Sequence, residues 1–184
     1  MGSTWVLVDP TGEPRRDGRT DARGELARAV RRIGLFSNNK QNAAEIEDAV
    51  GTWAREQHGV EVRSYLKLNA SVPAEPELVD QMVAECEVVV TGSGDCGSCT
   101  SATVHDTVAL RRRGLAVAML TSDAFVELAR MQGEALGDED LDLLVVRHPI
   151  GGITPDELCE RQAEAVQGIA PWWDHVTRDV VAAT

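Results

Sequence analysis

Short apolar runs alternate with longer amphipathic segments along most of this chain, and no other feature constrains its fold as strongly. The runs are Ile33–Phe36, Val60–Leu66, Val88–Thr91, Leu115–Leu120 and Leu141–Val146. Most are continuous rather than alternating, as strands buried on both faces require. Segments with helical spacing follow them, at 43–57, at 75–84, from the loop at 91–101 to 113, at 124–136 and after 154. This order predicts a three-layer α/β sandwich of about five mostly parallel strands with helices on both faces, flavodoxin/Rossmann-like in type.

The 184 residues suit one domain, which we assign to 33–170. Residues 1–32 read as a short N-terminal strand, Trp5–Val8, and a polar surface arm with a helix from about 21 to 32. Residues 171–184 read as a partly helical tail that carries Trp172 and Trp173. These tryptophans suit the core or a subunit contact, so a homodimer formed through the tail is one expectation.

Charge and cysteine content narrow the function classes. The formal net charge of −12 disfavours nucleic acid and anionic membranes as partners. The N-terminus lacks the basic and apolar regions of a signal peptide, and no run approaches the ~20 apolar residues of a membrane helix. A cytoplasmic location follows as an expectation. There, close cysteines serve catalysis, redox chemistry or metal binding more often than structural cross-linking.

Polar residues gather where the predicted strands end. The loops concerned are 37–42, 91–101, 121–123 and 147–152. In an open α/β sheet, ligands bind beyond the carboxyl ends of the strands. The sequence therefore predicts one pocket, built from these four loops, for a small-molecule substrate.

The loop after Val88–Thr91 supports two readings. Gly92, Gly94 and Gly97 give the G-x-G-x-x-G spacing of a dinucleotide cradle, whereas Cys96 and Cys99 give C-x-x-C. Against the cradle, the loop follows a middle strand, and the charge of Asp95 would repel a phosphate. The thiol reading is favoured because backbone N–H groups and the dipole at a helix start favour a thiolate. Inert packing, and a zinc site completed by Cys159 with a histidine, stay as alternatives.

The residues with chemical roles follow from this reading. Cys96 is the candidate nucleophile and Cys99 its resolving partner. His148, directly after a strand, is the candidate general acid, and His105 could orient or deprotonate a thiol; both histidines also have structural readings. Amides, an ammonium and backbone N–H groups in the loops suit an anionic substrate. The candidate substrate-binding residues are Asn38, Asn39, Lys40, Asn42, Asp95, Ser98, Asp123, Gly151 and Gly152.

The segment Asp95-Cys-Gly-Ser-Cys99 resembles the signature of the UGSC family of (seleno)proteins, in which cysteine can replace selenocysteine. The likeness extends to Leu7–Gly12, Asn38–Asn42, Val104–Asp106, Asp123–Phe125 and His148–Gly152, in that order along nearly the whole chain. The motif is more distantly similar to the selenocysteine segment of glycine and D-proline reductases. The resemblance implies a reactive residue at position 96, with sulfur in place of selenium, and it implies no particular substrate.

Two classes of function remain open at this point. In the first, the chain is an enzyme in which Cys96 attacks an electrophilic carbon or sulfur and Cys99 resolves the adduct, with no bound cofactor and with electrons from an external thiol or a thioredoxin-like protein. A non-redox lyase, transferase or isomerase using the same cysteine is a variant of it. In the second, the chain is a non-catalytic subunit of a reductase complex.

Overall fold

A computed structural model describes residues 30–181 and the side chains of residues 30–177. The expected N-terminal strand, and all but the last residues of the expected 1–32 arm, lie outside this range. Five parallel strands form one sheet in the order β2-β1-β3-β4-β5. They are β1 (Arg32–Ser37), β2 (Glu61–Leu66), β3 (Val88–Gly94), β4 (Ala116–Ser122) and β5 (Asp142–Val146). This order is that of the flavodoxin-like doubly wound fold, so the predicted fold class is confirmed.

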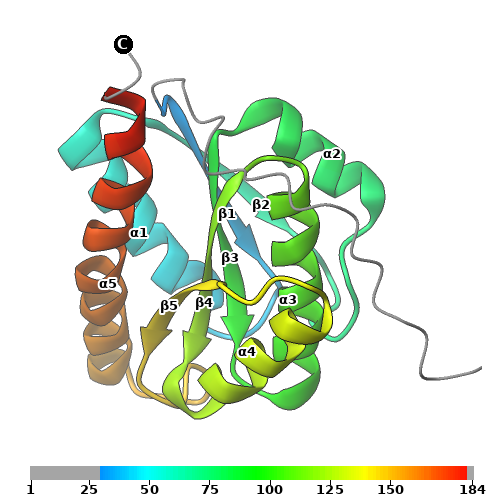
Figure 1. Ribbon diagram of the computed structural model, residues 1–184. Helices are drawn as coiled ribbons and strands as arrows, with labels where there is room; N and C mark the ends of the chain where they lie inside the picture. The colour runs from blue at the N-terminus through cyan, green and yellow to red at the C-terminus, as the bar shows by residue number, and fades with distance from the viewer. Residues whose placement is uncertain (1–29, 182–184) are drawn as a thin grey trace, which may run out of the picture.

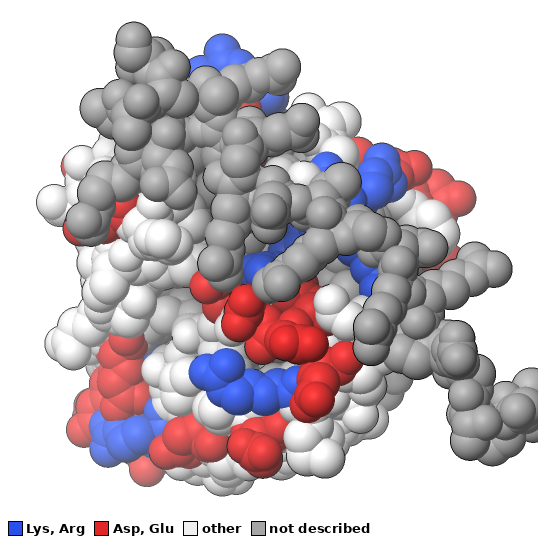
Figure 2. Space-filling view, viewed as in Figure 1, with Lys and Arg blue, Asp and Glu red and all other residues white. Residues whose placement is uncertain are grey.

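Helices cover both faces of the sheet, as Figure 1 shows. On one face lie α1 (Ala43–His58) and α5 (Pro155–Val181), packed on β1, β3, β4 and β5 through the largest apolar cluster. On the other lie α2 (Pro76–Glu85), α3 (Gly97–Arg112) and α4 (Val126–Ala135), the last preceded by a 3-10 turn, η2 (Asp123–Phe125). Basic side chains lie next to acidic ones on the face seen in Figure 2. None of the described helices is long and apolar enough to cross a bilayer.

The two C-terminal tryptophans lie within α5, which runs without a break through residues 171–181. Trp173 is buried and packs edge-on against Trp53 of α1, with ring centroids 5.9 Å apart. It also stacks on His58. Its aromatic surface is therefore used within the domain, and a homodimer through this segment stays a prediction.

Gly92 and Gly94 end β3 in a closely packed environment. A Cβ at Gly92 would lie 2.6 Å from the Glu47 carboxylate and 3.0 Å from the Cβ of Leu120. A Cβ at Gly94 would lie 2.8 Å from the Thr121 hydroxyl oxygen. Both glycines are buried. Close packing beneath the strand end thus gives these two glycines a structural reason that does not involve a phosphate.

Glu47 is the most unusual residue of this packing. It lies on α1, its side chain is 1% exposed, and its Oε1 has no hydrogen-bond partner among the described residues. Burial, reinforced by the nearby Asp48, raises the pKa of the Glu47 carboxyl well above its ordinary value. The group is therefore held in its neutral form under Gly92.

Replacing Gly92 with alanine should destabilise the fold. The added methyl group meets a fully buried carboxyl and the backbone-proximal Cβ of Leu120, neither of which can swing into solvent. Overpacking of this kind costs about 1–3 kcal/mol, measurable by urea unfolding. Gly97→Ala is the matched control, because no atom lies within 4 Å of its added Cβ. Equal stability of the two variants would contradict the packing account.

Glu47→Gln should change how stability depends on pH. A carboxyl that is protonated in the folded chain but ionised in the unfolded chain makes the free energy of unfolding fall as pH rises above 4.5, its ordinary pKa. Glutamine has no such dependence, so the variant should gain stability relative to wild type as pH rises. Urea unfolding at several pH values measures this difference. Glu56→Gln, at an exposed position of the same helix, is the control, and its difference in unfolding free energy from wild type should not grow with pH. The same trend in both variants would contradict the account of a buried, protonated Glu47.

Candidate active site at the carboxyl ends of the strands

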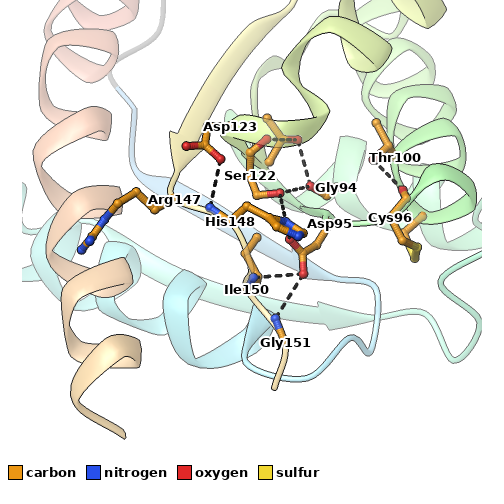
Figure 3. A network of polar contacts seen from close by, with 12 residues as sticks. Gly94, Asp95, Cys96, Thr100, Ser122, Asp123, Arg147, His148, Ile150 and Gly151 are labelled. Atoms are coloured by element: carbon orange, nitrogen blue, oxygen red, sulfur yellow. Dashed lines mark hydrogen bonds and ion pairs between the residues drawn. A yellow bond between two sulfur atoms is a disulfide. The ribbon is translucent and has the colours of Figure 1, made fainter. Parts of the chain in front are cut away.

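The polar strand-end loops meet at one edge of the sheet, as the sequence predicts. Figure 3 shows residues from the ends of β3, β4 and β5 converging there, with Asp95 lying between His148 and Cys96. All five strands are parallel, so their carboxyl ends share this edge. The site is thus assembled by the topology, from loops that are far apart in the sequence.

Cys96 and Cys99 form a disulfide across the start of α3. Cys96 is the N-cap residue in an extended conformation, and its carbonyl accepts hydrogen bonds from the Thr100 amide at 2.9 Å and the Thr100 hydroxyl at 2.7 Å. The two Cα atoms lie 5.4 Å apart, within the usual range for a disulfide. Cys96 is half-buried, whereas Cys99 is only 1% exposed. One sulfur thus faces the site and the other lies beneath it.

Asp95 ties the cysteine loop to the loop after β5. One carboxylate oxygen lies 2.9 Å from Nδ1 of His148, and the other accepts the backbone N–H groups of Ile150 at 3.0 Å and Gly151 at 3.1 Å. The Asp95 side chain is only 10% exposed. Its charge is therefore matched by oriented donors, and it fixes the position of the segment 148–151 relative to β3.

His148 is held from three sides. Its Nδ1 also lies 3.1 Å from the Ser122 hydroxyl, its backbone N–H donates to Asp123 at 3.0 Å, and its ring contacts Phe125. The ring stays partly exposed. Because Nδ1 faces Asp95 and Ser122, the other ring nitrogen, Nε2, is left for proton exchange at the edge where Cys96 lies.

Some polar residues of the loop after β1 bond to other loops, and others are exposed to solvent. Asn38 is buried, and its side-chain amide donates to the Ser93 carbonyl at 2.9 Å and to the Thr103 hydroxyl at 3.2 Å. Asn42 donates to the Ile150 carbonyl at 2.7 Å. Both asparagines therefore brace the site. Lys40 is half-buried and has no ion-pair partner among the described residues, and Asn39 is exposed.

Several predicted residues lie at the margin. Ser98 is exposed and contacts Ser71 at 3.1 Å, and the backbone N–H of Gly152 donates to the Gln41 side chain at 3.2 Å. His105 is exposed on α3, and no described contact joins it to either cysteine. It follows Cys99 by six residues, which places it on a different side of the helix. His148 is thus joined to the cysteine loop through Asp95, next to Cys96, whereas no described contact joins His105 to that loop.

Sequence reasoning missed residues whose role depends on tertiary contacts. Thr121 and Ser122 donate to the Gly94 carbonyl at 2.9 Å and 3.4 Å, and Ser122 also meets His148. Gln41, Ser71 and Lys67 join loops around the cysteines. The signal for Gln41, Thr121 and Ser122 was their place in the predicted strand-end loops 37–42 and 121–123; Ser71 and Lys67 lie outside these loops.

A zinc site and a cavity elsewhere in the domain are the alternatives to this strand-end site. Within the described residues, no three His, Cys, Asp or Glu side chains are placed to hold one metal ion, so the zinc alternative lacks a ligand set there. A cavity of about 300 Å³ lies at the start of β5 and is lined by Asp142, Leu144, Gly168, Trp172 and His175. It is at the opposite end of β5 from His148, away from the cysteines.

A sequence profile of the UGSC family matches residues 6–175. The chain belongs to the UGSC family. The match includes the Cys96-Gly-Ser-Cys99 turn and His148, and it confirms the predicted resemblance. No match was found among curated proteins.

Solved structures with some likeness include a flavoprotein and a flavodoxin-like domain. A diflavin flavoprotein A3 from Nostoc sp. is 15% identical, with a TM-score of 0.49 over 85% of this chain and 100% of that one. A flavodoxin-like domain from Synechococcus sp. is 14% identical, with a TM-score of 0.41 over 77% and 97%. For this UGSC-family chain, the strand order by itself defines the fold.

Asp95→Asn should loosen the site. Asparagine has one acceptor oxygen, so it cannot accept from the Nδ1–H of His148 and from the backbone N–H groups of Ile150 and Gly151 as the two carboxylate oxygens do. An unmatched donor costs about 1–3 kcal/mol, measurable as a loss in the free energy of unfolding. Asp123→Asn is the control, because Asp123 accepts a single N–H through one oxygen that asparagine retains. An equal loss in both variants would contradict this role for Asp95.

Proposed function

We propose that this chain is a thiol-dependent enzyme that cleaves or exchanges a bond in a small anionic molecule. The observation that carries the proposal is the Cys96–Cys99 disulfide, with the exposed sulfur at the edge that also holds His148. Membership of a family named for this tetrapeptide supports a reactive residue at position 96. The substrate and the reductant are the parts that experiment must supply.

In the proposed reaction the reduced form acts first. The Cys96 thiolate attacks an electrophilic carbon or sulfur, and the electron pair of the broken bond leaves with the departing group. The Cys99 thiolate then attacks the Cys96 sulfur, which releases the reduced product and closes the disulfide. The substrate gains two electrons and two protons, and the cysteine pair loses them. An external thiol restores the pair, which requires a reducing compartment such as the cytoplasm.

His148 is the proposed general acid. The departing group needs a proton, and Nε2 of His148 is the ring nitrogen not engaged by Asp95 or Ser122. The carboxylate fixes the orientation of the ring, as acidic partners of catalytic histidines do. Lys40, which has no ion-pair partner among the described residues, is the proposed anchor for a substrate carboxylate or other anion.

A non-redox reaction is the second candidate, and the Asp95–His148 contact favours it. Cys96 and His148 would then act as an acid–base pair, or as nucleophile and proton donor, in a lyase, transferase or isomerase step. Cys99 would remain a thiol through the cycle. The two candidates differ in whether product formation leaves the disulfide behind.

Serine variants of the two cysteines test the proposal in a Cys159→Ser background, which removes an exposed thiol. Candidate metabolites should leave a covalent adduct on Cys96 that accumulates in Cys99→Ser, because the resolving thiolate is missing. Cys96→Ser should form no adduct. Intact-mass measurement detects both outcomes. In the protein that retains both cysteines, turnover should close the Cys96–Cys99 disulfide, which lowers the intact mass by two hydrogen atoms.

The same assay separates the alternatives. Product formation without disulfide formation would favour the non-redox reaction, and turnover that survives both serine variants would rule out either use of this loop. His148→Gln should slow cleavage of the bond to the departing group and leave disulfide formation by mild oxidation unchanged. If His148→Gln has the full rate at every pH, His148 is not the general acid.

A further inference from the structure

A short exposed apolar segment lies beside the cysteine turn. Five large apolar side chains are strongly exposed among the described residues. Three of them fall within seven residues of the chain: Leu66, which ends the edge strand β2, and Leu68 and Val72, which follow it. Leu68 is 81% exposed, Leu66 50% and Val72 47%. We call these three side chains the Leu68 patch. Exposed apolar groups concentrated in one place on a surface mark an interaction site more often than scattered ones do.

The segment that carries the patch is firmly held. Lys67 is buried, forms an ion pair with Asp106 of α3, and donates to the Val72 carbonyl at 2.9 Å. The other oxygen of Asp106 accepts the Ala74 backbone N–H at 2.7 Å. Burial raises the pKa of Asp106, and the contacts with Lys67 and Ala74 oppose that rise. The charged partners thus lie inward and the apolar side chains outward.

The patch adjoins the disulfide. The Ser71 hydroxyl lies 3.1 Å from that of Ser98, which stands between Cys96 and Cys99. On its other side, Asn39 donates to the Leu68 carbonyl at 3.4 Å. A macromolecule that covered Leu68 and Val72 would therefore lie against the cysteine turn.

The disulfide offers one sulfur for reduction. Cys99 is 1% exposed, so an incoming thiolate must attack Cys96, which is half-buried, and Cys99 must leave. Exchange requires the attacking sulfur to be aligned with the bond that it breaks. A small thiol gains nothing from three outward-facing apolar groups. A protein that covers them gains binding energy and is aligned by that contact.

We propose that the Leu68 patch docks the protein dithiol that reduces the Cys96–Cys99 disulfide, an inference that rests on the proposed function. Such a partner presents an exposed cysteine within an apolar surface of its own. Its first thiolate attacks Cys96 to give a mixed disulfide and a free Cys99 thiolate, which takes up a proton. Its second thiolate then attacks the mixed disulfide, which frees Cys96. The partner is oxidised by two electrons and the Cys96–Cys99 pair is reduced by two.

Reduction of the oxidised full chain by two probes tests the proposal, with thioredoxin as the protein dithiol and dithiothreitol as the small one. Quenched samples are alkylated and weighed intact to follow the disulfide. Leu68→Asp and Leu68→Gln should each lower kcat/KM for thioredoxin by about tenfold, as expected when a central apolar contact is lost. Neither should change the rate with dithiothreitol. Met131→Asp, on an exposed apolar residue of α4, should leave both rates unchanged.

Each outcome decides a separate question. If neither probe reduces the pair, or if no disulfide forms, the proposed function fails. If both probes work and the Leu68 variants keep the full thioredoxin rate, the function stands and the docking inference is overturned. It is also overturned if sedimentation shows a wild-type dimer that Leu68→Gln dissociates, because a second copy then covers the patch. Leu68→Gln adds no charge, so a loss seen only in Leu68→Asp would likewise refute apolar docking.

Discussion

The candidate site depends on the hydrogen bonds that the Asp95 carboxylate makes. It joins the end of β3 to the loop after β5 through one histidine and two backbone N–H groups, across a separation of more than fifty residues. Without it, the sheet would still bring the strand ends to one edge, but the direct bond between the cysteine loop and the loop of His148 would be lost. A negative charge in this loop argues against a phosphate ligand, and the structure uses that charge to organise the loops themselves.

Beneath this network the strand end is packed so closely that side chains are excluded. Gly92 lies over the buried carboxyl of Glu47, and Gly94 lies over the hydroxyl of Thr121, which donates to the Gly94 carbonyl. Hydroxyl and amide groups around β3 and α3 then take up the backbone groups that the strand end exposes, as with Asn38 and the Ser93 carbonyl. A polar, close-packed base of this kind limits the movement of the cysteine turn above it.

The fold was readable from the sequence because it depends on local periodicity. Continuous apolar runs such as Val88–Val90 and helical spacing in Ala43–His58 identify a buried parallel sheet whatever the distant contacts are. The cysteine pair and His148 were readable because they stand at strand ends. Gly92 was harder to interpret from the sequence. Its spacing from Gly94 and Gly97 fits a phosphate cradle, but in the fold it packs against Glu47, a residue of α1 that lies forty-five positions earlier. The pairing of Lys67 with Asp106 carried no signal, although Asp106 belongs to a segment of the family likeness, because the pair exists only once the loop after β2 reaches α3.

The unequal exposure of the two sulfurs gives direction to the chemistry of the site. Cys96 caps α3 and faces the edge where His148 and Lys40 lie, whereas Cys99 faces inward under the first turn. In the proposed cycle, an attacking thiolate and an attacked disulfide therefore both use Cys96, and Cys99 is in each case the internal partner. Under that proposal substrate and reductant reach the same sulfur and act in turn, so a surface for the reductant would lie beside the substrate loops rather than over them. The Leu68 patch adjoins the cysteine turn through Ser71 and Ser98, on the side of the outer strand β2. His148 follows β5, the outer strand on the opposite side of the sheet.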